Sequence, residues 1–203
     1  MSASQAIREL IASLPTGEIF TPSLFAEMGS RAAVDQALMR LAKAGSIDRI
    51  GHGLYVLPQK DRFGVKPLPT PEQVAWAIAR AEGATIEVHG AEAARRFGFT
   101  TQMPAQPVFY TTGSSRTIRL EKMVVRLQHV APRKLILEGR PAGQALSALW
   151  YLGRNQVTSD TFMRLAERLP ATEFRVLCGA KSSMPAWMVQ ALHSYEYSGL
   201  MHG

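Results

Sequence analysis

The stretch that decides the fold of this chain is residues 21–58, TPSLFAEMGSRAAVDQALMRLAKAGSIDRIGHGLYVLP. Its first part predicts a short helix, because Thr21 offers a capping hydroxyl and Pro22 suits the first helical position, where a missing N–H costs nothing. Gly29 ends that helix, and Ser30 caps a second helix after no more than a tight turn. The stretch therefore opens with two short, closely joined helices.

The second half of the stretch predicts the body of the second helix, which ends at Gly45, followed by a β-hairpin. Ile47 and Ile50 precede the turn Gly51-His52-Gly53, and an apolar strand follows it. Helix, short turn, helix and β-ribbon is the order of a winged helix-turn-helix, so nucleic-acid binding is the first functional hypothesis. The second helix has apolar residues at helical spacing, and those expected to face the core are Val34, Ala37, Leu38 and Leu41.

The opposite face of this second helix carries polar residues suited to DNA. In a helix-turn-helix, the first part of the second helix meets base edges in the major groove. Arginine suits guanine and glutamine suits adenine, so Arg31, Gln36 and Arg40 are candidates for base reading. Lys43 is better placed for a phosphate. With the capping serine and two residues of the ribbon, the predicted DNA-binding set is Ser30, Arg31, Gln36, Arg40, Lys43, Arg49 and His52.

Each of these residues also has a purely structural explanation. Arg40 and Lys43 lie near the C-terminus of their helix, where the helix dipole alone favours a cation. Asp35 also points outward and would repel DNA unless it pairs with Arg31, one helical turn away. A Gly-His-Gly sequence is an ordinary turn as well. The functional hypothesis therefore depends on the order of the elements more than on any single residue.

The composition of the whole chain is that of a folded protein with a basic balance. The 203 residues carry a formal net charge of +7, which favours an anionic partner. Cys178 is the only cysteine, so an internal disulfide and a multi-cysteine zinc site are excluded, in agreement with a reducing cytosol. No apolar run is long enough to span a membrane, and the N-terminus lacks the pattern of a signal peptide. We therefore expect a cytoplasmic protein that does not bind a membrane.

The sequence predicts an α+β protein with two domains. Residues 61–71, DRFGVKPLPTP, form the expected linker between a winged helix-turn-helix at 1–60 and a mixed α+β domain at 72–203. Thr112–Ser115 is expected to turn one strand into the next. A run of strands followed by a run of helices favours α+β over a doubly wound sheet. The expected strands are 85–89, 107–111, 116–120 and 123–130, and the expected helices are 71–82, 90–97, 142–153, 159–169, 173–178 and 185–195.

Four segments of this chain resemble a known family. ALMRLAKAGSIDRIGHGLYVLP (37–58) resembles the winged-helix head of AbiEi-type antitoxins of type IV, abortive-infection toxin–antitoxin systems. GAEAARRFGFTTQMP, VFYTTGSSRTIRL and HVAPRKL look like the second domain of that group. The resemblance implies a transcriptional repressor that binds inverted repeats at its own operon and antagonises a nucleotidyltransferase-like toxin. It also implies that the chain itself has no catalytic activity.

A second group of cations is a candidate for contact with the DNA backbone or with a protein partner. Residues 116–140 hold seven Lys or Arg against two Glu, a net of +5. These cations can contact DNA flanking the operator or an acidic surface of the toxin. They can equally be solvated charges that protect a strand edge from aggregation. The candidates are Arg116, Arg119, Lys122, Arg126, Arg133 and Lys134.

No motif in the sequence points to an enzyme. The five histidines lack the spacing of a metal-binding helix, and Thr112-Gly-Ser-Ser is not followed by the paired carboxylates that a nucleotidyltransferase needs for its metals. We therefore expect no catalytic residue, no metal and no cofactor.

Two other functions stay open. One is an antitoxin that acts by protein interaction alone, with the winged helix as a scaffold, and the other is a winged-helix regulator with a small-ligand pocket in its second domain. The polar outward face of residues 31–44 favours DNA binding over the scaffold. Nothing in the sequence excludes the ligand-responsive regulator.

Overall fold

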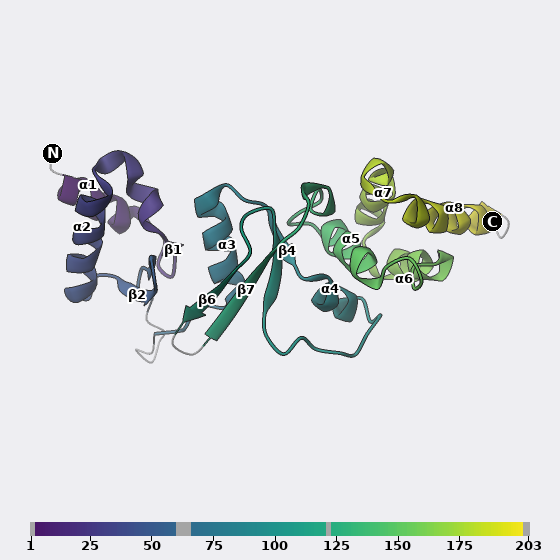
Figure 1. Cartoon of the computed structure of the whole chain (residues 1–203), viewed down its shortest axis with the longest axis horizontal. Helices are drawn as coiled ribbons and strands as arrows, with labels where there is room; N and C mark the ends of the chain where they lie inside the picture. The colour runs from purple at the N-terminus through teal and green to yellow at the C-terminus, as the bar shows by residue number, and fades with distance from the viewer. Residues whose placement is uncertain (1–2, 60–65, 121–122, 201–203) are drawn as a thin grey trace. The chain divides into compact units, whose positions relative to one another are not determined.

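The computed structural model describes residues 3–59, 66–120 and 123–200, so Lys122 and part of the expected linker lie outside the described residues. The fold is α+β, with two small sheets (Figure 1). The chain forms two compact units, one of Met1–Ala84 with Thr117–Val125 and the other of Thr85–Arg116 with Arg126–Gly203. No helix in the described ranges is long and apolar enough to cross a membrane.

The first unit contains four helices and a three-stranded sheet among its described residues. Its sheet has the strand order β1-β3-β2, and β3 pairs antiparallel with both neighbours. The elements in chain order are α1 (Ala3–Ser13), β1 (Ile19–Phe20), the 3₁₀ helix η1 (Pro22–Met28), α2 (Arg31–Lys43), β2 (Asp48–Gly51), β3 (Leu54–Val56) and α3 (Pro71–Glu82).

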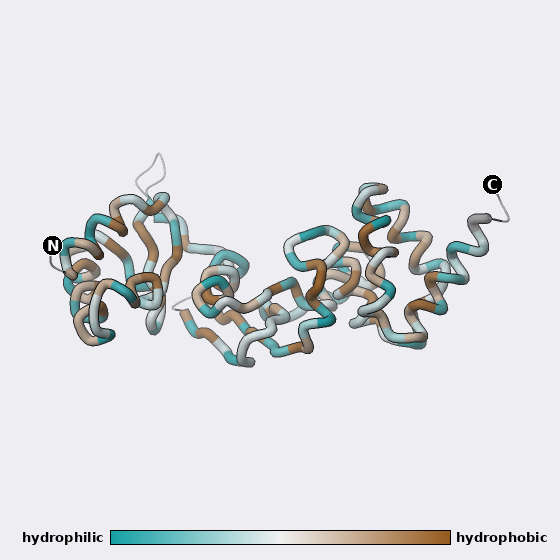
Figure 2. The backbone as a smooth tube through the Cα atoms, turned by 90° about the horizontal axis from the view of Figure 1, so that it is seen from above, coloured by the Kyte–Doolittle hydropathy of each residue, from teal (hydrophilic) through white to brown (hydrophobic). Residues whose placement is uncertain are grey.

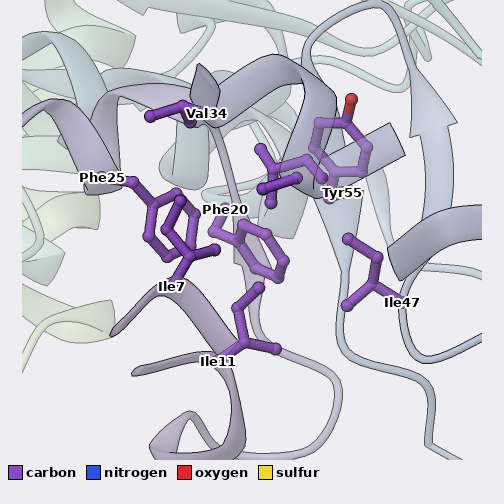
Figure 3. Close-up of a cluster of buried hydrophobic side chains, with 9 residues drawn as sticks. Ile7, Ile11, Phe20, Phe25, Val34, Ile47 and Tyr55 are labelled. Carbon is purple, nitrogen blue, oxygen red and sulfur yellow. The ribbon is translucent and has the colours of Figure 1, made fainter. Parts of the chain in front are cut away.

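An aromatic cluster lies at the centre of this unit (Figure 3). The ring of Phe20 meets that of Phe25 edge-on at 5.8 Å and stacks on Tyr55 at 6.0 Å, geometries that favour aromatic pairs. Helix α1 adds Ile7 and Ile11, which are both buried. The predicted core face of α2 is confirmed. Val34, Ala37 and Leu38 are buried, and Leu41 is partly buried and packs against the same cluster.

A helix forms at 22–28 as expected, but it differs from the prediction in its type and in its cap. It is a 3₁₀ helix interrupted at Phe25, whose φ of −111° and ψ of 16° are not helical. The predicted side-chain cap by Thr21 is wrong, because no capping bond forms and the hydroxyl lies 2.6 Å from Ser23 Oγ instead. Phe25 is fully buried, so the interruption occurs at the residue that this segment contributes to the core.

Helix α3 forms over the predicted residues and is grouped with the first unit. Its start has a capping box, in which the Gln73 N–H donates to Thr70 Oγ1 and the Thr70 N–H donates to Gln73 Oε1. The helix contacts β1, and Arg80 forms an ion pair with Glu18 at 2.9 Å. The sequence-based boundary assigns this helix to the second domain, which is expected to begin at residue 72, whereas the contacts group it with the first unit.

The second unit contains the remaining helices and most of a four-stranded sheet with the order β4-β5-β7-β6. Hydrophilic and hydrophobic residues alternate along the backbone, as expected where one face of each element packs inward (Figure 2). The elements after α3 are β4 (Ile86–Val88), α4 (Gly90–Arg96), β5 (Val108–Thr111), β6 (Arg116–Leu120), β7 (Met123–His129), η2 (Pro132–Lys134), α5 (Pro141–Leu152), α6 (Ser159–Arg168), α7 (Ala171–Gly179), η3 (Lys181–Ser183) and α8 (Ala186–Leu200). Of these, most of β6 and the start of β7 are grouped with the first unit through Thr117–Val125.

The loop at Thr112–Ser115 connects β5 to β6 along the chain, as expected, but these two strands are not neighbours in the sheet. Thr112–Ser115 does not turn β5 onto β6 as its neighbour, because β5 pairs in parallel with β7, with Phe109 opposite Leu127. The loop is fastened to the end of β7 instead. The His129 N–H donates to Ser115 Oγ at 2.8 Å, and His129 Nδ1 lies 2.9 Å from the Gly113 carbonyl oxygen.

Glu173 of α7 connects two helices of the second unit. Its carboxylate accepts from Arg140 Nη2 at 2.7 Å and from the Ala142 N–H at 3.2 Å. The second bond satisfies a free N–H in the first turn of α5, a helix that has no side-chain cap from its own flanking residue. The Arg140 guanidinium first, and then the Ala142 N–H, lower the pKa of Glu173 below its ordinary value.

We predict that Glu173→Gln lowers the melting temperature of the protein at pH 7. A lowered pKa in the folded state means that the stabilisation is complete above the ordinary glutamate pKa of 4.5 and is lost as the pH falls through the lowered pKa. Thermal unfolding of the variant and of the wild type should therefore differ at pH 7 and converge in acid. Glu167→Gln, which changes an exposed carboxylate of α6, is the control. A difference between wild type and Glu173→Gln that is constant across this range would contradict the assignment.

Candidate nucleic-acid interface

Helix α2 begins at its predicted cap. Ser30 Oγ accepts from the Ala33 N–H at 3.3 Å, as a helix N-cap requires. The core contacts of α2 use one face, so the opposite face is exposed. The exposed members of the predicted set on this helix are Arg31, Gln36, Arg40 and Lys43, and Met39 between them is 65% exposed.

Arg31 is held by an acidic neighbour within the helix. Its Nε donates to Asp35 Oδ2 at 2.8 Å, and both side chains are substantially exposed. An exposed ion pair of this kind contributes little stability and is easily exchanged for another partner. Asp35 is expected from the sequence to repel DNA unless it pairs with Arg31, and the structure contains this pair.

Arg40 and Lys43 differ from Arg31 in having no carboxylate partner among the described residues. Together with Gln36 they occupy positions i, i+4 and i+7, which lie on one face of a helix. The structure therefore brings three of the predicted residues together on a single polar face. This face can donate hydrogen bonds to acceptor groups and attract anions.

The β2–β3 hairpin carries the other two predicted residues. Arg49 and His52 are exposed, and the register shifts between Arg49 and Gly51. Gly53 completes the turn with a φ of +65°, a conformation that favours glycine. Arg49 Nε donates to the Gly51 carbonyl oxygen at 3.3 Å.

The second predicted group of cations is divided between the two units. Arg119 belongs to the first unit and is exposed, whereas Arg116, Arg126, Arg133 and Lys134 belong to the second. On β7, Arg126 is exposed between the buried residues Val125 and Leu127.

Arg133 and Lys134 are organised by an aromatic ring that the sequence reasoning did not connect with them. The Arg133 guanidinium lies 5.4 Å and the Lys134 ammonium 4.8 Å from the ring centre of Trp150. Trp150 in turn meets Trp187 edge-on at 6.2 Å. Cation–π attraction holds two like charges close together, and neither cation has an ion-pair partner in the described part of the chain.

The polar residues near β4 have structural roles. Glu87 is buried and accepts from the Val88 and Gly139 N–H groups. His89 Nδ1 accepts from the Ala91 N–H and so caps α4, and burial lowers the pKa of His89. Within the described ranges, no cluster of three or more histidine, cysteine or acidic residues is placed to hold a metal ion.

Comparison with known proteins places this chain in a family. A model of a family of unknown function, DUF6088, matches residues 6–173. The chain belongs to the DUF6088 family. No curated protein matches it. The crystal structure of the RV2827C protein from Mycobacterium tuberculosis is similar over 94% of this chain and 80% of that one, with 16% identity and a TM-score of 0.37.

The contribution of the Ser30 cap to the stability of this DUF6088 protein can be tested by substitution. Ser30→Ala removes the acceptor for the Ala33 N–H and should lower the free energy of unfolding by about 1 kcal/mol. Thr21→Ala is the matched control, because Thr21 precedes η1 without capping it. Urea unfolding followed by circular dichroism measures both variants. Equal losses in the two would contradict the role of Ser30.

Proposed function

We propose that the DUF6088 chain is a DNA-binding transcriptional repressor whose first unit contains a winged helix-turn-helix. In this proposal η1 and α2 are the helix-turn-helix, and the β2–β3 hairpin is the wing. The observation that carries the proposal is the exposed face of α2, where Gln36, Arg40 and Lys43 have no carboxylate partner among the described residues. The order α1, β1, η1, α2, β2, β3 supports the same assignment.

The chemistry of α2 suits the major groove of duplex DNA. Arg40 can donate two hydrogen bonds to guanine, and Gln36 can both donate to and accept from adenine. Met39 is exposed on the same side and offers an apolar contact for a thymine methyl group. Lys43, one turn beyond Arg40, is placed for a phosphate. Sequence reading is therefore assigned to Gln36 and Arg40, and attraction to the backbone to Lys43.

The start of α2 and the wing supply the remaining contacts in the proposal. Arg31 exchanges its exposed pair with Asp35 for a DNA group, and Ser30 offers its hydroxyl to a phosphate. Arg49 and His52 on the wing meet the phosphate backbone. These contacts carry no sequence information, but they fix the orientation of α2 in the groove.

We further propose that the protein autoregulates its own operon and acts as a type IV antitoxin against a nucleotidyltransferase-like toxin. This part rests on the resemblance of four sequence segments to AbiEi-type antitoxins. One of them, HVAPRKL, contains Arg133 and Lys134, which both lie over the Trp150 ring and have no ion-pair partner in the described ranges. Arginine and tryptophan are enriched among residues that dominate protein interfaces. The proposed role of the chain is binding, without a catalytic step.

Arg40→Ala should weaken binding to the operator by about 1–3 kcal/mol while leaving the fold intact, because it removes a bidentate base contact. The measurement is a gel-shift titration with a duplex that covers the region upstream of the gene. Arg8→Ala, which removes an exposed arginine of α1, is the control for loss of charge. Operator affinity that is unchanged in Arg40→Ala would contradict the assignment of α2 as the reading helix.

Replacing Arg133 and Lys134 together by Glu should abolish protection against the toxin. The full-length variant and the wild type are co-expressed with the adjacent gene, and growth is compared at equal protein levels. Arg154→Glu reverses an exposed charge elsewhere in the second unit and should protect like the wild type. If the wild type does not change growth, the antitoxin proposal is wrong; if the double variant protects fully, these two residues are not its basis.

A further inference from the structure

Within the first unit, the β2–β3 hairpin contacts a segment that is distant in sequence. This unit includes Thr117–Val125. A Cβ placed on Gly51 would lie 2.6 Å from Leu120 Cδ2 and 3.8 Å from the Arg119 carbonyl oxygen. Gly51 does not have a positive φ, so its backbone conformation does not demand glycine. Leu120 therefore occupies the space that a side chain at position 51 would fill.

The contact extends beyond a single pair of residues. A cleft of about 340 Å³ is lined by Arg49 and Ile50 of β2 together with Leu120 and Met123. Leu120 and Met123 are only partly exposed. Leu120 and Met123 thus line the same cleft as two residues of β2.

Among the described residues, two exposed arginines lie on the segments that form this contact. They are Arg49 of β2 and Arg119 of β6. Asp48, the acidic residue of β2, is neutralised by Lys66, whose Nζ lies 2.8 Å from both carboxylate oxygens. Neither Arg49 nor Arg119 has an ion-pair partner among the described residues. Arg49 and Arg119 therefore lie on either side of the contact between Gly51 and Leu120.

We infer that Arg119 extends the phosphate-binding surface of the wing, so that Arg119 and the β2–β3 hairpin hold the backbone of the same DNA duplex. The inference rests on the proposed DNA-binding function and adds a second contact segment to it. The ligand is the phosphodiester backbone, which the cations recognise without regard to sequence. Each phosphate contact releases condensed counterions and contributes about 0.9 to the slope of log affinity against log salt concentration.

Salt titrations of the full-length protein test this assignment. Binding is measured by fluorescence anisotropy with a random-sequence duplex and with the upstream-region duplex, for wild type, Arg49→Ala, Arg119→Ala and the control Arg154→Ala. We expect the slope to fall by about 0.9 in Arg49→Ala and in Arg119→Ala. In Arg119→Ala the ratio of specific to random affinity should stay unchanged. Arg154→Ala should behave like the wild type.

The outcomes separate this inference from the proposed function. A wild type that binds neither duplex overturns the proposed function. A slope that falls in Arg49→Ala and not in Arg119→Ala leaves the wing on DNA and overturns the inference. An equal fall in Arg154→Ala means that any cation has the same effect, which also overturns it.

A pair of substitutions tests the contact itself without removing a charge. Gly51→Val places a side chain in the space of Leu120, so it should displace Leu120 and the adjacent Arg119 and lower the salt slope as Arg119→Ala does. Adding Leu120→Ala makes room for the new side chain and should restore the slope. Unchanged melting temperatures show that the variants are folded. An unaltered slope in Gly51→Val, or no recovery in the double variant, overturns the assigned contact.

Discussion

The packing of Phe20 against Phe25 and Tyr55 is the interaction on which the first unit depends. The rings come from β1, η1 and β3, so this one cluster connects three short elements of the unit. Helix α2 adds Leu38 and its apolar neighbours to the same core. Because that core covers one face of α2, the face with Gln36 and Arg40 has to be exposed. The proposed reading surface is in this sense a consequence of the aromatic core.

The carboxylates of the chain pair with some of its cations and leave others without an ion-pair partner among the described residues. Asp35 pairs with Arg31, Asp48 with Lys66, and Glu173 with Arg140. Cations without such partners in the described residues lie on α2, on the β2–β3 hairpin, on the 117–125 segment and over Trp150. In the proposed function, specific reading and general attraction to DNA belong to different side chains, and Arg133 and Lys134 serve a separate partner.

Much of the first unit could be predicted from local signals. The cap at Ser30, the hairpin turn and the bounds of α3 depend on residues within one or two helical turns of one another. The interruption of η1 at Phe25 could not be predicted in this way, because it accompanies the burial of that side chain in a distant core. Arg133 and Lys134 were predicted as candidates, but their contact with Trp150 was missed for a similar reason, since the ring lies on another element.

The sequence by itself determined which face of α2 is apolar, where that helix begins, and which cations are available for an anionic partner. Helical spacing and capping are local, so no distant residue was needed. Only the tertiary structure decided that β5 pairs in parallel with β7, and that Leu120 fills the space beside Gly51. Side chains alternate with the same period in parallel and antiparallel strands, so the pattern does not specify the partner. A contact across 69 positions of the chain leaves no periodic signal in either segment.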